Sequence, residues 1–189
     1  MPRPPILPTI DWPSIWTFAL GFEDWLDSAE SEDHAQRINE NLAAICLEPQ
    51  EQAAMQNLSR LVRVVAFAED WCGDVIRHVP ALQALSDVSG MLHVRYITRE
   101  QHPDVFARFL TNGGEAVPKF IFLSDQYTEC GHWGPMPEAC RQLIARGKAC
   151  GDVPSARKKV AAMYEADADQ RVVVRELREL AEIAAAVAP

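Results

Sequence analysis

The sequence predicts an α/β fold in which a βαβαββα core is built around a central mixed sheet. Three apolar runs of strand length, at residues 61–67, 91–97 and 117–123, carry this prediction. Helical segments follow the first and second runs, which indicates parallel strands joined by right-handed crossovers. A short turn at residues 124–126 joins the third run to a fourth at 127–133, which predicts an antiparallel hairpin.

Residues 1–60 are predicted to form an N-terminal helical extension. The first helix is expected at residues 13–28, opened by Pro13, because apolar residues recur there at helical spacing. These residues are Trp12, Ile15, Trp16, Ala19, Leu20, Phe22 and Trp25. Two more helices are expected at residues 35–46 and 49–61, the second opened by Pro49.

Residues 61–150 are predicted to form the α/β domain itself. A helix over residues 72–86 follows the first strand and presents one apolar stripe, interrupted by Pro80. The stripe consists of Val75, Ile76, Val79, Leu82 and Leu85. A short helix is expected at residues 102–110, ended by the Asn-Gly-Gly run at 112–114, and another at 137–146 after the hairpin.

Residues 151–189 are predicted to form a C-terminal helical extension. Apolar residues recur there at helical spacings, and charges of alternating sign lie between them. The pattern predicts one long helix or two, packed on the domain or on a second subunit. Packing on a second subunit would give a homodimer formed through the helical extensions.

The overall charge and apolar patterning exclude several classes of protein. A net charge of −9 over 189 residues argues against binding to nucleic acid or to an anionic membrane surface. No apolar run has the length of a membrane span. The N-terminal Met-Pro-Arg-Pro-Pro run lacks the pattern of a secretory signal, so a cytoplasmic location is expected.

The five cysteines are scattered along the chain and form no close pair. An odd number of scattered cysteines fits a reducing compartment rather than a disulfide framework. Cys46 and Cys140 are expected to be small buried side chains. Cysteines and histidines do not show the spacing of a zinc site, and neither a metal nor a cofactor is expected.

Cys72 is the candidate reactive residue. It follows the first predicted strand and begins the next helix, where unpaired backbone N–H groups favour the thiolate and lower the pKa of a thiol. Three acidic residues, Glu69, Asp70 and Asp74, oppose this effect because negative charge disfavours the thiolate. The sequence leaves the net direction of the pKa shift open.

Four motifs in order resemble those of the thioredoxin-like superfamily, in particular an uncharacterised bacterial branch that usually carries Trp-Cys-Gly-Asp-Cys. The motifs are Trp-Cys-Gly-Asp at residues 71–74, Thr-Asn-Gly-Gly at 111–114, Val-Pro-Lys-Phe-Ile-Phe-Leu at 117–123 and Gly-His-Trp-Gly-Pro at 131–135. The resemblance covers residues 61–146 and implies the thioredoxin fold.

The resemblance also implies roles for individual residues. Cys72 would be the nucleophile, Trp71 would shield one side of its sulfur, and Gly73 would let a partner's backbone approach. Pro118 would be a cis-proline beside the thiol, leaving the Val117 backbone free to pair with an extended peptide. Asp74 completes the expected substrate-binding set, which is Trp71, Gly73, Asp74, Val117 and Pro118.

Two substitutions depart from the thioredoxin pattern. Val75 stands where the second, resolving cysteine is usual, and Ala66 stands where thioredoxins carry a buried acid. His78, one turn beyond Asp74, is expected to be a solvated residue on the helix face, with a Cys–His nucleophilic pair as the alternative.

The leading functional prediction is therefore monothiol disulfide exchange with a protein or a low-molecular-weight thiol such as glutathione. The alternative is a non-catalytic module that binds peptides or proteins. Iron–sulfur cluster carriage is a third and weaker alternative, because Asp74 and Val75 do not match the Cys-Gly-Phe-Ser motif of monothiol glutaredoxins.

Overall fold

A computed structural model describes residues 6–186 of the protein. It contains a four-stranded mixed sheet made of β1 (Val62–Phe67), β2 (Leu92–Ile97), β3 (Lys119–Leu123) and β4 (Glu129–Trp133), in the order β2-β1-β3-β4. β1 runs parallel to β2, whereas β3 is antiparallel to both of its neighbours. The thioredoxin fold expected from the sequence, a βαβαββα core around a mixed sheet, is confirmed.

The register of the sheet determines where the candidate site lies. Phe67, the last residue of β1, is paired with Lys119, the first residue of β3. The loop that leaves β1 and the loop that enters β3 therefore meet at the same edge of the sheet. Cys72 follows the first of these loops, and the Val117–Pro118 segment ends the second.

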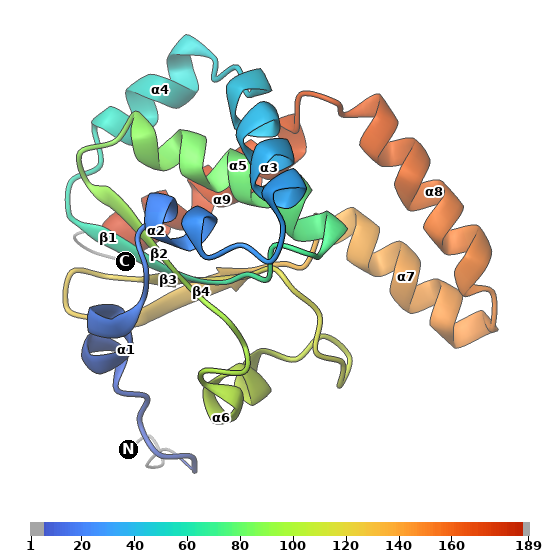
Figure 1. The fold of residues 1–189 in the computed structure, drawn as a ribbon, viewed down its shortest axis with the longest axis horizontal. Coiled ribbons are helices and arrows are strands. Elements are labelled where there is room, and N and C mark those ends of the chain that lie inside the picture. The colour runs from blue at the N-terminus through green and yellow to red at the C-terminus, as the bar shows by residue number, and fades with distance from the viewer. Residues whose placement is uncertain (1–5, 187–189) are drawn as a thin grey trace.

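Helices cover both faces of the sheet (Figure 1). On one face lie α5 (Gly73–Asp87) and α9 (Arg171–Ala185), with α3 (Glu32–Ala44) and α4 (Pro49–Gln56) packed on them. On the other lie α1 (Trp12–Phe18), α6 (Pro103–Phe106) and the 3₁₀ turn η1 (Ala107–Phe109). Burial on both sides explains why β1 is apolar at every position except Arg63.

The prediction of one helix over residues 13–28 is wrong. The segment forms two short helices, α1 and α2 (Phe22–Asp27), with an extended break between them. In the break, the Leu20 N–H donates to the Tyr96 carbonyl at 3.0 Å and the Tyr96 N–H donates to the Leu20 carbonyl at 2.9 Å. These two hydrogen bonds add Leu20 to the edge of β2, and a continuous helix would forfeit them.

The N-terminal and C-terminal extensions share the core of the α/β domain. Trp25 and Met55 from the first, and Leu177 from the second, belong to the same buried cluster as the strands. The stripe predicted on α5 is buried at all five of its positions. Residues 60 and 150 separate segments that differ in sequence pattern. The buried apolar core continues across both boundaries.

The last helix of the α/β domain and the first helix of the C-terminal extension form a helical hairpin. α7 (Glu138–Cys150) and α8 (Val153–Ala166) pack against each other at one end of the molecule, and α9 returns to the sheet (Figure 1). The predicted packing of this extension on the domain is confirmed for its described residues. The last three residues of the predicted helical segment, 187–189, and the run at 1–5 lie outside the described residues.

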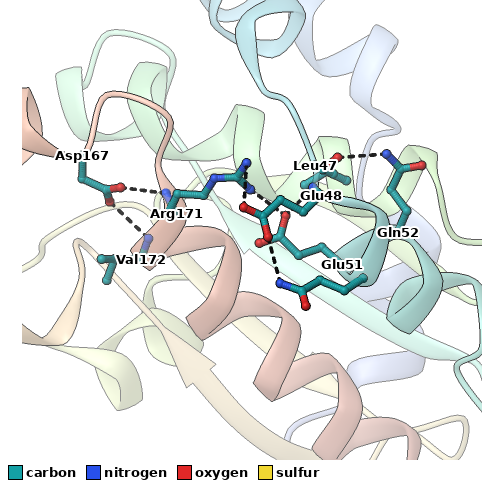
Figure 2. Close-up of polar contacts among 8 residues, drawn as sticks. Leu47, Glu48, Glu51, Gln52, Asp167, Arg171 and Val172 are labelled. Carbon is teal, nitrogen blue, oxygen red and sulfur yellow. Dashed lines mark hydrogen bonds and ion pairs between the residues drawn. The ribbon is translucent and has the colours of Figure 1, made fainter.

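Figure 2 shows how polar side chains fix the start of α9 to α4. The guanidinium of Arg171 lies 2.7 Å from the carboxylate of Glu51 and 3.4 Å from that of Glu48. Glu51 also accepts the Glu48 N–H at 2.7 Å, which satisfies a free donor at the N-terminus of α4. Asp167 accepts the N–H groups of Arg171 and Val172 at 2.8 and 3.1 Å. Segments about 120 residues apart are thereby joined.

No helix within residues 6–186 has both the length and the apolar character needed to cross a membrane.

Candidate functional site

Cys72 is the N-cap residue of α5 and is half-buried. Its thiol donates a hydrogen bond to the Val117 carbonyl, with 3.6 Å between Sγ and the oxygen. The Val117–Pro118 peptide bond is cis, as the resemblance implies. The structure therefore brings together the two motifs, some 45 residues apart, that were expected to form one site.

The surroundings of Cys72 make its thiol less acidic than usual. Burial raises the pKa, the N–H groups of Val75 and Asp74 lower it, and the charges of Asp74 and Glu69 raise it further. The net direction, which the sequence left open, is upward. The helix effect is present, but desolvation of the half-buried sulfur outweighs it.

The two departures from the thioredoxin pattern are both fully buried. Val75 fills the position of the resolving cysteine in the first turn of α5, and Ala66 lies within β1. Neither side chain can donate a proton or attack a disulfide. Cys72 therefore has neither the adjacent thiol nor the buried acid that a dithiol cycle uses.

The other four cysteines are unpaired thiols. Cys140 is buried as expected, with its sulfur 4.0 Å from that of Met163. The prediction that Cys46 is buried is wrong, because it lies in the exposed segment that follows α3. Among residues 6–186, no three histidine, cysteine or acidic side chains are grouped so that they could hold a metal ion.

On its solvent side, the site is bordered by Trp71 and Gly73. The Trp71 side chain is exposed, and the Arg99 guanidinium lies 5.5 Å from the centre of its ring. A Cβ atom added at Gly73 would meet no atom within 4 Å. The position beside the Gly73 Cα is therefore open space.

Glu69 is a buried acid that sequence reasoning treated only as a nearby charge. Its Oε1 accepts the Arg99 N–H at 2.9 Å and lies 3.6 Å from the Arg99 guanidinium, while Oε2 has no hydrogen-bond partner among the described residues. Burial raises the pKa of Glu69, and the contacts with Arg99 oppose that rise.

His78 belongs to a buried network behind Cys72, so the prediction of a solvated histidine is wrong. Its Nε2 lies 3.1 Å from the Tyr164 hydroxyl, and its Nδ1 lies 3.1 Å from the Gln170 side-chain oxygen. The Tyr164 hydroxyl also lies 3.0 Å from Asp74 Oδ1. His78 is directed at Tyr164 and Gln170 rather than at the sulfur, which also argues against the Cys–His pair.

Burial of this network shifts its pKa values. Desolvation lowers the pKa of His78 to about 3, so that the imidazole is neutral. It raises the pKa of Asp74, although the Tyr164 hydroxyl and the charge of Arg77 oppose the rise. No sequence signal marked Tyr164 or Gln170, because both come from the C-terminal extension and look like ordinary helix-surface residues.

The fold and this site together define a thioredoxin-like protein with one cysteine in the active-site position. A family model described as thioredoxin matches residues 20–153, and the chain belongs to that family. The match begins within the N-terminal helices, upstream of the segment in which the motifs were recognised.

Two solved structures show the same fold. A protein of unknown function from Pseudomonas aeruginosa is 14% identical, with a TM-score of 0.73 over 92% of this chain and 98% of the other. An HIV epitope-scaffold is 16% identical, with a TM-score of 0.63 over 83% and 99% of the two chains. A search of curated proteins gives no match. At these identities the likeness concerns the fold alone.

Proposed function

We propose that the protein performs monothiol disulfide exchange at Cys72. The observation that carries the proposal is the contact between the Cys72 thiol and the carbonyl of the cis Val117–Pro118 segment, at the N-terminus of α5. This arrangement presents a single sulfur beside a backbone segment that can align an extended substrate. The open space at Gly73 supports access to that sulfur.

The exchange takes place in two balanced steps. The Cys72 thiol loses its proton to solvent, and its thiolate attacks one sulfur of a disulfide. A mixed disulfide with Cys72 forms, and the other sulfur leaves as a thiolate with the electron pair of the broken bond. A low-molecular-weight thiolate then attacks the substrate's sulfur in the mixed disulfide and releases Cys72. An external thiol is needed because Val75 cannot perform this second attack.

The raised pKa of Cys72 bears on the rate of the first step. At neutral pH the sulfur is mainly a thiol, and only the small thiolate fraction attacks. We therefore propose a slow exchanger whose mixed disulfide is long-lived. The five free thiols are in keeping with a reducing, cytoplasmic setting, which belongs to the same proposal.

A second candidate function is non-catalytic peptide binding, favoured by the same raised pKa. The Val117 N–H makes no hydrogen bond with any described residue, so this edge has a free donor for a peptide strand. In this function the Cys72 thiol takes no part in a reaction.

The experiment that tests the exchange is reaction with glutathione disulfide, followed by peptide mapping of the modified cysteines. Cys46 and Cys150 are exposed and serve as internal reference thiols. We expect the Cys72 adduct to resist hydrolysis and to be released by reduced glutathione. The protein should also catalyse deglutathionylation of a model peptide by reduced glutathione, and Cys72→Ser should abolish that turnover while Cys46→Ser leaves it intact.

Equal turnover by the wild type and Cys72→Ser would overturn the exchange function. A peptide that bound both proteins with the same affinity would then support the binding module. Both variants should first be compared by urea unfolding, so that a loss of turnover is not a loss of fold.

A further inference from the structure

A polar cavity lies beside the first residue of β3, outside the Cys72 site. Its volume is about 400 Å³, within the range of small-molecule sites. It is open to solvent and is lined by the loop at residues 110–112, by β3 and β4, and by the first turns of α7. The chemistry-bearing residues of its wall are Thr111, Lys119, His132, Glu138 and Arg141.

Lys119 is a buried ammonium without a carboxylate partner. Only 3% of the residue is exposed, and its Nζ donates to the Thr111 hydroxyl oxygen at 2.6 Å and to the Gly134 carbonyl at 2.8 Å. An ammonium has three donors, so one remains after these two contacts. Within residues 6–186, Lys119 forms no ion pair. Buried charges are ordinarily paired, because desolvation of an isolated ion is costly.

Arg141 adds a second unpaired cation to the same wall. Its guanidinium donates to the Gly134 carbonyl at 3.3 Å and to the Met136 carbonyl at 3.0 Å. It too lacks an ion pair in the described part of the chain. Because Lys119 and Arg141 donate to the same oxygen, one anionic group can contact both.

Burial, and after it repulsion from neighbouring cations, lowers the pKa values of Lys119 and His132. Burial and the charge of Arg141 lower the pKa of Lys119 to about 8. Burial and the charges of Lys119 and Arg141 lower the pKa of His132. Glu138 is the one acid of the wall; it is exposed and accepts a hydrogen bond from Gln142 at 3.1 Å, rather than pairing with the cations. In a protein of net charge −9, two unpaired cations that converge on one cavity mark a place for a negative ligand.

We propose that this cavity binds a small molecule through an oxyanion group, a carboxylate or a phosphate, held between Lys119 and Arg141. The Thr111 hydroxyl, whose oxygen accepts from Lys119, keeps its own hydrogen to donate to the same group. Arg141 offers further guanidinium N–H donors, which suit the two oxygens of such a group. The site does not require the Cys72 sulfur.

The test is titration of the ¹⁵N-labelled protein with inorganic phosphate and, separately, with glutarate at constant ionic strength. We expect saturable shifts at the amides of residues 111, 119, 132 and 141. Arg141→Gln should weaken binding about tenfold or more, since it removes a charged donor. Arg146→Gln, the same change at an exposed position of α7, should leave binding within about twofold of the wild type, as expected for a charge outside the site.

The two probes also identify the source of the oxyanion. Binding of phosphate alone assigns a phosphate ligand, binding of glutarate alone assigns a carboxylate, and binding of both assigns an oxyanion of either kind. The proposal is overturned if neither probe gives saturable shifts, or if Arg141→Gln and Arg146→Gln behave alike. The same titrations in Cys72→Ser should match those of the wild type, so failure here is separate from failure of the exchange function.

Discussion

The hydroxyl of Tyr164 lies 3.0 Å from the carboxylate of Asp74, which is two residues from Cys72. Because the same hydroxyl contacts His78, a proton on Asp74 and the tautomer of His78 are linked. When Asp74 is ionised, Tyr164 donates to it, His78 donates its Nε2–H to Tyr164, and the Gln170 amide must turn so that its NH₂ group donates to Nδ1. When Asp74 is protonated, it donates to Tyr164, Tyr164 donates to Nε2, and the Nδ1–H donates to Gln170.

The first prediction concerns Tyr164→Phe, which removes this shared hydroxyl. We expect the free energy of unfolding to fall by about 1–2 kcal/mol, because two buried polar groups lose a partner. The pKa of Asp74 should rise, since the hydroxyl that stabilises its carboxylate is gone. Urea unfolding and carboxyl NMR titration measure the two effects. Tyr127→Phe is the matched control, since its hydroxyl makes no hydrogen bond within residues 6–186. Equal losses for both variants would contradict the role given to the network.

The second prediction concerns pH. The pKa of His78 is about 3 in the folded protein, against 6.5 for an ordinary histidine, so between these values the unfolded chain holds the extra proton. Stability should therefore fall as pH decreases below 6.5, by up to about 1.4 kcal/mol per pH unit from this group. Asp74 acts in the opposite sense, because its raised pKa favours the folded state in acid.

His78 can be separated from Asp74 by direct observation. Its imidazole resonances should stay those of the neutral ring from pH 8 to about pH 5, the range above its folded pKa. Arg77 is the other charged group near this ring, and its charge also lowers the pKa of His78. In urea unfolding, His93→Gln, which removes an exposed imidazole, should leave the slope of stability against pH unchanged. A protonated His78 at pH 6 would refute the burial argument.

The third prediction concerns Glu69→Gln. The charge of Glu69 is one of the causes that raise the pKa of Cys72, so its removal should lower that pKa. Because burial is the larger cause, we expect alkylation of Cys72 at pH 7.5 to accelerate by only about two- to fivefold. Iodoacetamide kinetics with mass mapping give the rate at each cysteine. Glu129→Gln, at the far end of the sheet, should leave the Cys72 rate unchanged. A slower reaction in Glu69→Gln would mean that the charge acts through another group.

The strands and their order could be predicted from the sequence because each is a short apolar run between clear turn signals. The structure places β1 at Val62–Phe67 and β2 at Leu92–Ile97, each within a residue of its predicted bounds. The break at Leu20 could not be predicted, since helical spacing continues through it. Its cause is a pair of backbone hydrogen bonds to Tyr96, a tertiary effect that overrides local preference.

The parts of the site that lie in sequence motifs could be predicted. The parts that depend on residues far away in the sequence could not. The proximity of Cys72 to Val117 follows from two motifs of one fold. The burial of His78 depends on Tyr164 and Gln170, some 90 residues away, and its own surroundings in the sequence favour an exposed helix face. Lys119 begins an otherwise apolar strand, and a single lysine in that setting does not predict the cavity beside it.

The buried network behind Cys72 is completed late in synthesis, because two of its residues come from the C-terminal extension. Tyr164 and Gln170 are synthesised after α5. The Arg77 guanidinium, on α5, donates hydrogen bonds to the carbonyls of Tyr164 and Asp167, both at 2.9 Å. On a ribosome, where the chain emerges from its N-terminus, Arg77 and His78 of α5 precede these partners by about 90 residues of synthesis, and the polar back of the helix stays open to water in that interval. The face of α5 that carries Arg77 and His78 is therefore completed only after the chain has been synthesised as far as Gln170.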